Sequence, residues 1–135
     1  MHTVYLSLGS NLGDKEQNLA SAISEIARRI GDITAQSALL ETEPWGFDSE
    51  NTFLNAAVRV ETELSPLDLL HVTQQIEQDL GRTHKSQHGQ YHDRIIDIDI
   101  LLYDDLHIQT PELTIPHPLM QQRDFVLIPL KEIMK

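Results

Sequence analysis

The stretch RIIDIDILLY, residues 94–103, decides the fold of this chain. Seven of its ten residues are Ile, Leu or Tyr and none is Gly or Pro, so it predicts a β-strand. Side chains at alternate positions of a strand share one face, which places Asp97 and Asp99 together, about 6.5–7 Å apart along the backbone. The isoleucines beside them are expected on the opposite face.

Two interpretations of this pair of carboxylates are open from the stretch alone. Like charges at this spacing disfavour joint ionisation unless a cation lies between them. Mg²⁺ takes one or two carboxylates and leaves its other positions to water and phosphate, so one interpretation is a Mg-nucleotide site. The other is an antiparallel strand with one solvated polar face, which is common.

The composition limits the class of protein. A chain of 135 residues is expected to form one domain, residues 1–135, that buries an ordinary core. No apolar run approaches the roughly 18 residues of a membrane span, and the absence of cysteine favours a cytoplasmic protein. The net charge of −11 argues against a nucleic-acid or anionic-membrane partner, since either needs a basic face.

Strand and helix patterns follow one another along the chain. Asp14 and Ser65 are typical helix N-caps, and Gly31 and Gly81 stand where the two helices are expected to end. In chain order the expected elements are a strand at 3–8, a turn at 9–13, a helix at 14–30, strands at 33–41 and 53–63, a helix at 65–80 and the strand at 94–103.

This order, β-α-β-β-α-β, predicts an α+β domain of the ferredoxin-like class, with an antiparallel sheet and both helices on one face. The other face is then expected to be free for loops and ligand. A short C-terminal extension follows, with an irregular or short β segment at 106–114 and a short helix at 125–134 that contains Pro129. The fold alone assigns no function.

Cationic residues gather around the acidic strand. Residues 82–93 form a basic, histidine-rich loop that leads directly into it. The region 82–123 holds five of the seven histidines together with Arg82, Lys85, Arg94 and Arg123. A basic pocket on an acidic protein favours a small anionic ligand over a charged polymer.

The chain resembles the 6-hydroxymethyl-7,8-dihydropterin pyrophosphokinase family nearly from end to end. The matching segments are LGSNLGD (8–14), ETEPWG (41–46), FLNAAV (53–58), IEQDLGR (76–82), DRIIDIDILLY (93–103) and IPHPLMQQRDF (115–125). The patterns D-R-x-I-D-I-D-I-L and P-H-P-x-M-x-x-R-x-F are specific to the family. The resemblance favours the metal interpretation of the acidic strand.

The resemblance implies an ATP-dependent diphosphotransferase of folate biosynthesis. Such an enzyme transfers pyrophosphate from ATP to the hydroxymethyl group of 6-hydroxymethyl-7,8-dihydropterin and releases AMP. It implies two Mg²⁺ ions as cofactors and ATP as co-substrate. Attack at the β-phosphorus would be assisted mainly by positioning and by electrostatic stabilisation. We expect small-molecule substrates only, no nucleic acid, no membrane, and a monomer.

The resemblance also assigns roles to residues of this chain. The expected catalytic residues are Arg82, Arg94, Asp97 and Asp99, of which Asp97 and Asp99 hold the metal. ATP is expected to contact Gln74, Glu77, Lys85, Arg94, Ile100, Thr114, His117 and Arg123. The pterin is expected to contact Thr42, Glu43, Trp45, Gly46, Phe53, Asn55, Asp97 and Phe125, with the two phenylalanines stacking on the ring.

Two other classes of function compete with this one. A regulatory ferredoxin-like module with a cation site and no turnover predicts no clustered arginines near the acidic pair, whereas Arg82, Arg94 and Arg123 are there. An RNA-binding module of the same topology needs aromatic, basic sheet motifs and a positive charge, and the sequence has neither.

Overall fold

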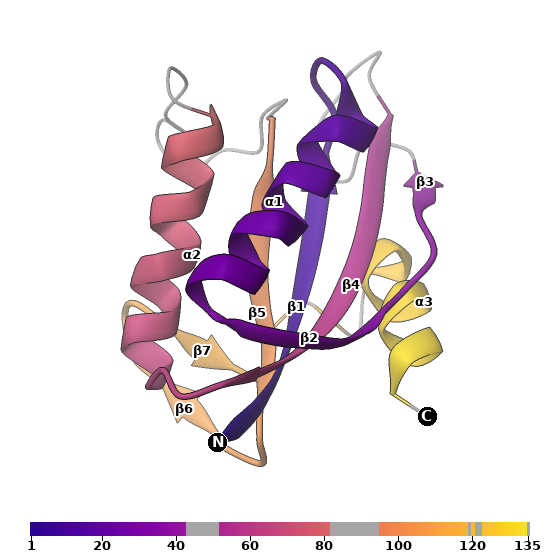
Figure 1. Ribbon diagram of the computed structural model, residues 1–135. Helices are drawn as coiled ribbons and strands as arrows, with labels where there is room; N and C mark the ends of the chain where they lie inside the picture. The colour runs from indigo at the N-terminus through magenta and orange to yellow at the C-terminus, as the bar shows by residue number, and fades with distance from the viewer. Residues whose placement is uncertain (43–51, 82–94, 119, 121–122, 135) are drawn as a thin grey trace.

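The structure is a computed structural model that describes residues 1–42, 52–81, 95–118, 120 and 123–134. The first half of the chain forms β1 (His2–Ser10), α1 (Lys15–Arg29), β2 (Gly31–Gln36), β3 (Leu40–Thr42) and β4 (Phe53–Thr62). The second half forms α2 (Pro66–Gly81), β5 (Asp97–Tyr103), β6 (Ile108–Gln109), β7 (Thr114–Ile115) and α3 (Asp124–Ile133), as Figure 1 shows.

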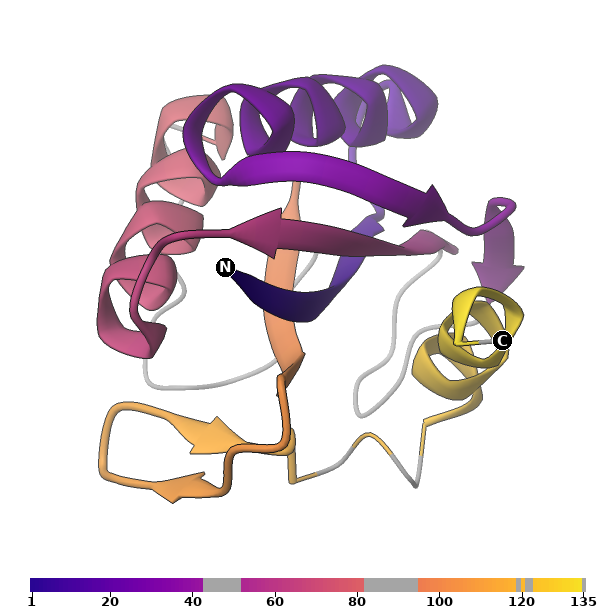
Figure 2. The same cartoon turned by 60° about the horizontal axis from the view of Figure 1, so that its bottom comes forward.

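The main sheet has the strand order β2-β4-β1-β5, with β3 added to β4, and the pairings are antiparallel. Each of the units β1-α1-β2 and β4-α2-β5 returns to the sheet with one strand left between its own two strands. Both crossover helices therefore lie on the same face of the sheet (Figures 1 and 2). This confirms the ferredoxin-like α+β fold expected from the order of elements.

The main core lies between this face and the two helices. Apolar residues of β1, β4 and β5 on this face contribute to it, and α1 and α2 add one apolar stripe each. Its fully buried members include Val4, Leu6, Leu8, Leu19, Ile26, Val58, Val60, Leu69 and Ile76. No helix in the described part of the chain is long and apolar enough to cross a membrane.

The helix starts agree with the caps expected from the sequence. The Asp14 carboxylate accepts a hydrogen bond from the Gln17 N–H at 3.1 Å, and the Ser65 hydroxyl accepts one from the Asp68 N–H at 3.3 Å. The helix α1 ends just before Gly31, as expected, but the structure gives a second reason for a glycine at this position. Gly31 begins β2, and a Cβ there would lie 1.9 Å from the carbonyl oxygen of Glu61, so close strand approach requires glycine.

Two strand boundaries differ from the sequence prediction. The strand β1 continues through Gly9 to Ser10, where a turn was expected. The expected strand 33–41 is divided into β2 and β3 at Ser37. There the Ser37 hydroxyl, in place of a main-chain carbonyl, accepts the hydrogen bond of the Ala57 N–H at 2.9 Å, so the chain leaves the ladder without losing this bond.

The strand β5 contains a bulge at Leu101. Tyr5 pairs with Leu102 and Leu6 with Ile100, so Leu101 is the extra residue. The bulge shifts the alternation of side chains by one position. Leu101 lies on the face away from α1 and α2, as alternation from Asp97 and Asp99 requires. The shift places Leu102 on that face as well and returns Tyr103 to the main core.

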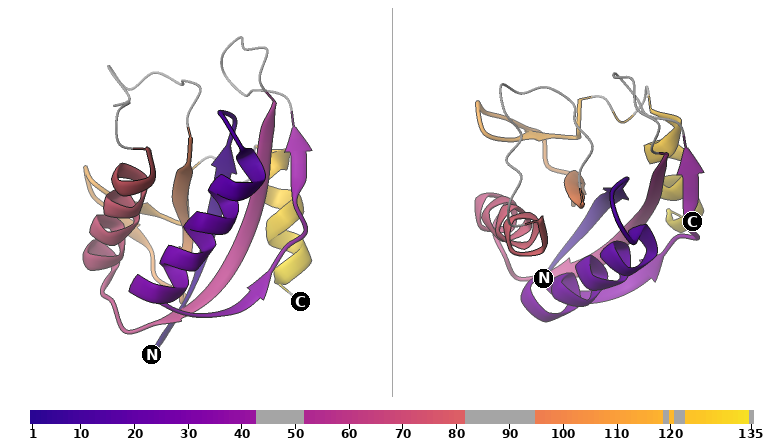
Figure 3. Two further views of the ribbon diagram at one scale, coloured as in Figure 1. Left: turned by 45° about the horizontal axis from the view of Figure 1, so that its top comes forward. Right: turned by 90° about the horizontal axis from the view of Figure 1, so that it is seen from above.

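The helix α3 covers part of the face that was expected to be free. Val126 and Leu130 of α3 pack with Leu101 and Met120 in a second, smaller core. Figures 2 and 3 show α3 beside β3 and β4, on the other side of the sheet from α1. A ligand on this face is therefore confined to the part that α3 leaves open.

Candidate active site

Asp97 and Asp99 lie on the sheet face opposite to α1 and α2. Asp97 pairs with Gly9 and Asp99 with Ser7 on the neighbouring strand β1. The isoleucines that alternate with them are buried in the main core. The alternation predicted for this strand is confirmed, and it brings both carboxylates to the start of β5, the upper end of the sheet in Figure 1.

Glu77 of α2 reaches the same place around the edge of the sheet. Its Oε2 accepts a hydrogen bond from the Ile98 N–H at 2.7 Å. Burial, followed by the charge of Asp97, raises the pKa of Glu77 to about 9, and a side-chain hydrogen bond with Asp97 and the charge of Asp99 act in the same direction. Glu77 is therefore protonated at neutral pH, and the negative charge at this point belongs to Asp97 and Asp99.

The donor set fits Mg²⁺ shared with a substrate better than a metal held by protein alone. Among the described residues, no group of three or more His, Cys, Asp or Glu side chains has the arrangement that encloses an ion. Mg²⁺ in nucleotide enzymes is usually bound by one or two carboxylates, with water and phosphate oxygens as its other ligands. The like charges of Asp97 and Asp99, which raise the pKa of Glu77, are those that such an ion would neutralise.

Arg123 supplies positive charge close to this cluster, and His117 lies beside it. The His117 N–H donates to the carbonyl oxygen of Leu101 at 3.0 Å, which ties the segment after β7 to the bulge of β5. Burial and the charge of Arg123 lower the pKa of His117, while the charge of Asp97 opposes them. Arg123 is only 6% exposed, and its guanidinium lies 5.4 Å from the centre of the Phe125 ring. A buried guanidinium is suited to bind an anionic ligand.

Asn55 of β4 faces the same side as the acidic pair. Its Nδ2 donates to the Leu40 carbonyl oxygen at 3.2 Å and to the Thr42 hydroxyl at 2.8 Å. The side chain is buried, with only 2% exposure. Both of its partners belong to β3, so this short strand determines how the Asn55 amide is oriented.

Gly9 lies between the two groups of side chains. It pairs with Asp97 on one side and with Asn55 on the other. A Cβ on Gly9 would lie 3.2 Å from Asn55 Oδ1 and 3.6 Å from Cδ1 of Phe53. The glycine therefore leaves a floor of bare backbone beside the ring of Phe53.

The other described candidates lie in four different settings. Phe125 is the second residue of α3 and packs at the edge of the second core. Gln74 is exposed on α2, one turn before Glu77, and Thr114 begins β7. The side chain of Ile100 is buried in the main core, so only its main chain is available to a nucleotide. The expected site residues Arg82, Lys85, Arg94, Glu43, Trp45 and Gly46 lie outside the described residues.

Sequence reasoning missed the part played by Gly9, which it assigned to a turn. The signal was an isolated glycine directly after an alternating strand, a pattern that also marks close approach of another group to the backbone. It also missed the main-chain oxygen of Leu40 and the contact of Glu77 with β5. These contacts join residues that are 15 and 21 positions apart, so no local sequence pattern predicts them.

Comparison with known proteins identifies the family. Residues 5–135 match the family described as 7,8-dihydro-6-hydroxymethylpterin-pyrophosphokinase (HPPK). The chain is 54% identical over 134 residues to the 2-amino-4-hydroxy-6-hydroxymethyldihydropteridine pyrophosphokinase of Porphyromonas gingivalis, covering 98% of this chain and 91% of that protein. It is 44% identical over 130 residues to the enzyme of the same name from Bacillus subtilis, covering 96% and 76%.

Solved structures agree with the fold. A Plasmodium falciparum HPPK-DHPS structure superposes with a TM-score of 0.77 at 18% identity, over 98% of this chain and 41% of that chain. This chain thus spans less than half of the fused protein. From the match to the family and the relatives that share its length, the chain belongs to the HPPK family and transfers pyrophosphate from ATP to 6-hydroxymethyl-7,8-dihydropterin in folate synthesis.

Proposed function

We propose that Asp97 and Asp99 hold two Mg²⁺ ions, and that the pterin lies beside them over Gly9 and against Asn55. The single observation that carries this proposal is the cross-strand row Asp97, Gly9, Asn55 on one sheet face. Neighbouring strands are about 4.8 Å apart, so the row spans roughly 10 Å. That length suits a ring at one end and a reacting phosphate at the other, with no side chain between them.

In this reaction the hydroxyl oxygen of the pterin attacks the β-phosphorus of ATP. The bond between the β-phosphorus and the oxygen that leaves with AMP breaks. When bound, Mg²⁺ would neutralise phosphate charge and favour loss of the hydroxyl proton. Asp97 and Asp99 hold the ions at the phosphate end of the row. The buried Arg123 supplies positive charge beside it, and His117 offers an imidazole to the phosphate oxygens. Arg82, Arg94 and Lys85 complete the phosphate-binding set in this proposal, since arginine forks match phosphate oxygens.

Stacking and hydrogen bonding would hold the pterin. Phe53 and Phe125 are proposed to stack on its two faces, and Thr42, Glu43, Trp45 and Gly46 to be further pterin contacts. Gln74, Glu77, Thr114 and the main chain of Ile100 are proposed to contact the nucleoside of ATP. What supports this division is that Asn55 and Phe53 flank one side of Gly9 while Asp97 flanks the other.

We also propose that the chain acts as a single domain and as a monomer. The continuous core between the sheet and its two crossover helices supports one folding unit. The absence of cysteine supports a cytoplasmic location. Sedimentation equilibrium measures the oligomeric state, and a dimer at micromolar concentration would contradict the proposed monomer.

The metal site is tested by counting bound ions rather than by activity alone. Mn²⁺ titration followed by electron paramagnetic resonance, with a non-hydrolysable ATP analogue present, should give two bound ions per chain. Asp97→Asn should lose at least one of them while its far-ultraviolet circular dichroism stays unchanged. A single ion in the unaltered protein, or two in the Asp97→Asn variant, would contradict the assignment.

A further inference from the structure

The orientation of the Asn55 amide is fixed by the chemistry of its partners. The Leu40 carbonyl oxygen only accepts hydrogen bonds, so the atom of Asn55 that faces it at 3.2 Å must be the amide nitrogen. The same nitrogen donates to the Thr42 hydroxyl at 2.8 Å. Both N–H groups of the amide are therefore used within the protein.

The amide oxygen is left facing the ligand floor. Asn55 Oδ1 lies 3.2 Å from the position where a Cβ of Gly9 would stand, directly above the bare backbone. In the part of the chain that the structure describes, no donor contacts this oxygen. Asn55 thus offers the site a hydrogen-bond acceptor and no donor.

The short strand β3 provides both partners that orient the Asn55 amide. It pairs only with β4 among the described strands, with Leu40 opposite Asn55 and Thr42 opposite Phe53. A three-residue edge strand adds little to the core. Its two contacts with the Asn55 amide instead restrict a side chain that would otherwise rotate by half a turn and present its NH₂ group.

We propose that Thr42 is a positioning residue whose hydroxyl, together with the Leu40 carbonyl, holds Asn55 as an acceptor-only group, so that the site selects ring ligands that present an N–H over Gly9. The proposal rests on the assignment of the pterin to Asn55 and deepens it. A buried acceptor that meets another acceptor loses its hydrogen bond entirely, so a ring without that N–H is rejected more strongly than its shape requires.

A double-mutant cycle tests whether Thr42 acts through Asn55. Thr42→Val removes the hydroxyl and keeps the shape and the strand preference of the side chain. It should weaken binding of 6-hydroxymethylpterin about three- to ten-fold, raising KM with kcat nearly unchanged, the size expected for one hydrogen bond. Thr42→Ser, which keeps the hydroxyl, should restore binding. In the Asn55→Ala background, Thr42→Val should cause no further loss.

The outcomes separate this inference from the proposed site. An equal loss from Thr42→Val in both backgrounds would overturn the positioning role and leave the pterin site standing. No loss from Asn55→Ala itself would overturn the pterin site and this inference with it. Thr42→Ala provides a second variant in case the valine side chain disturbs β3, and ATP-analogue affinity serves as the control for folding.

Selectivity is tested with a modified ring. A pterin in which the N3–H and the 2-amino hydrogens are replaced by methyl groups cannot donate at that edge. The unaltered protein should bind it at least ten-fold more weakly than 6-hydroxymethylpterin, and Asn55→Ala should reduce that ratio. Equal binding of the two ligands by the unaltered protein would overturn the acceptor-only assignment.

Discussion

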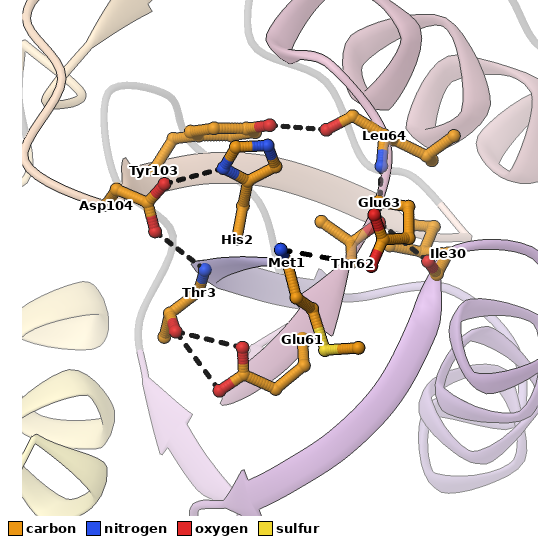
Figure 4. Close-up of polar contacts among 10 residues, drawn as sticks. All are labelled: Met1, His2, Thr3, Ile30, Glu61, Thr62, Glu63, Leu64, Tyr103 and Asp104. Atoms are coloured by element: carbon orange, nitrogen blue, oxygen red, sulfur yellow. Dashed lines mark hydrogen bonds and ion pairs between the residues drawn. The ribbon is translucent and has the colours of Figure 1, made fainter.

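The two ends of the central sheet both carry polar residues, but they arrange them in opposite ways. At the lower end, shown in Figure 4, Asp104 accepts from His2 Nδ1 at 2.8 Å and from the Thr3 N–H at 2.7 Å. Thr3 in turn donates from its hydroxyl to the Glu61 carboxylate. At the upper end, Asp97 and Asp99 stand beside a third carboxyl group, that of Glu77.

The difference is visible in the direction of the pKa shifts. The hydrogen bond from Thr3, followed by the one with His2, lowers the pKa of Asp104, so its folded environment favours the charged form. Burial and neighbouring negative charge raise the pKa of Glu77. Pairing of this kind stabilises a fold, whereas crowding of like charge is retained where a ligand relieves it. The lower end therefore has the pattern of a structural network, and the upper end has the pattern expected of the proposed ligand site.

Removal of a carboxylate from the upper end should give the largest effect on turnover. Asp97→Asn or Asp99→Asn should lower Mg-dependent AMP release on the order of 100-fold or more, because several kcal/mol of charge stabilisation is lost. The free energy of unfolding without metal should stay equal or rise, since a repulsion is removed. Product assays and urea titrations measure the two quantities.

Asp104→Asn is the matched control, since it removes a carboxylate from the other end of the same sheet. It should leave kcat and KM unchanged. Near-normal turnover in both Asp97→Asn and Asp99→Asn would contradict the assignment of the metal site to the upper end of the sheet.

The second largest effect is expected from the glycine floor. Gly9→Ala places a methyl group 3.2 Å from Asn55 Oδ1, and overpacking of this kind costs about 1–3 kcal/mol. Pterin affinity should fall roughly ten-fold or more. Gly81→Ala is the control, because a Cβ at Gly81 meets nothing within 4 Å. Isothermal titration with an ATP analogue bound measures both, and equal affinities would contradict an open floor at Gly9.

The pH dependence of stability should have opposite signs at the two ends. The folded pKa of Glu77, about 9, is above its ordinary value of 4.5. Its contribution to stability is therefore fully present below about pH 4.5 and is lost as the pH rises through about 9. In metal-free protein, Glu77→Gln should reduce the fall in urea midpoint between these values. An unchanged slope would indicate that Glu77 is not buried against Asp97.

The smallest effect is expected at the lower end. The pKa of Asp104 is lowered, so its contribution is present above its ordinary value of 3.8 and is lost as the pH falls through the folded value. Asp104→Asn should cost less than about 1 kcal/mol at neutral pH, because this pair is exposed and screened by solvent. A thermal melt at pH 7 and at pH 3 checks this, and a larger loss at pH 3 than at pH 7 would contradict it.

The strand and helix patterns were readable because they depend on near neighbours. Alternation along β5 predicted that Asp97 and Asp99 share a face, and the helix caps Asp14 and Ser65 were predicted from side chains three residues from their partners. The order of elements then sufficed for the ferredoxin-like topology. The motifs pointed to the family, and residues 5–135 match it.

Contacts between segments far apart in the sequence could not be predicted from patterns among near neighbours. The division of residues 33–41 at Ser37 depends on the Ala57 N–H, and the place of α3 depends on the packing of Val126 and Leu130 against Leu101 and Met120. Neither partner is near in the sequence, so no period or propensity encodes the pairing.

The amino-acid sequence by itself determined which residues bear charge, which faces they share within one element, and which family the chain joins. Only the tertiary structure decided that Gly9 separates Asp97 from Asn55, that Glu77 reaches the acidic pair, and that β3 turns the Asn55 oxygen toward the floor. The physical reason is that alternation and capping act within a few residues, whereas register, burial and the direction of an amide are set where separate strands and helices meet.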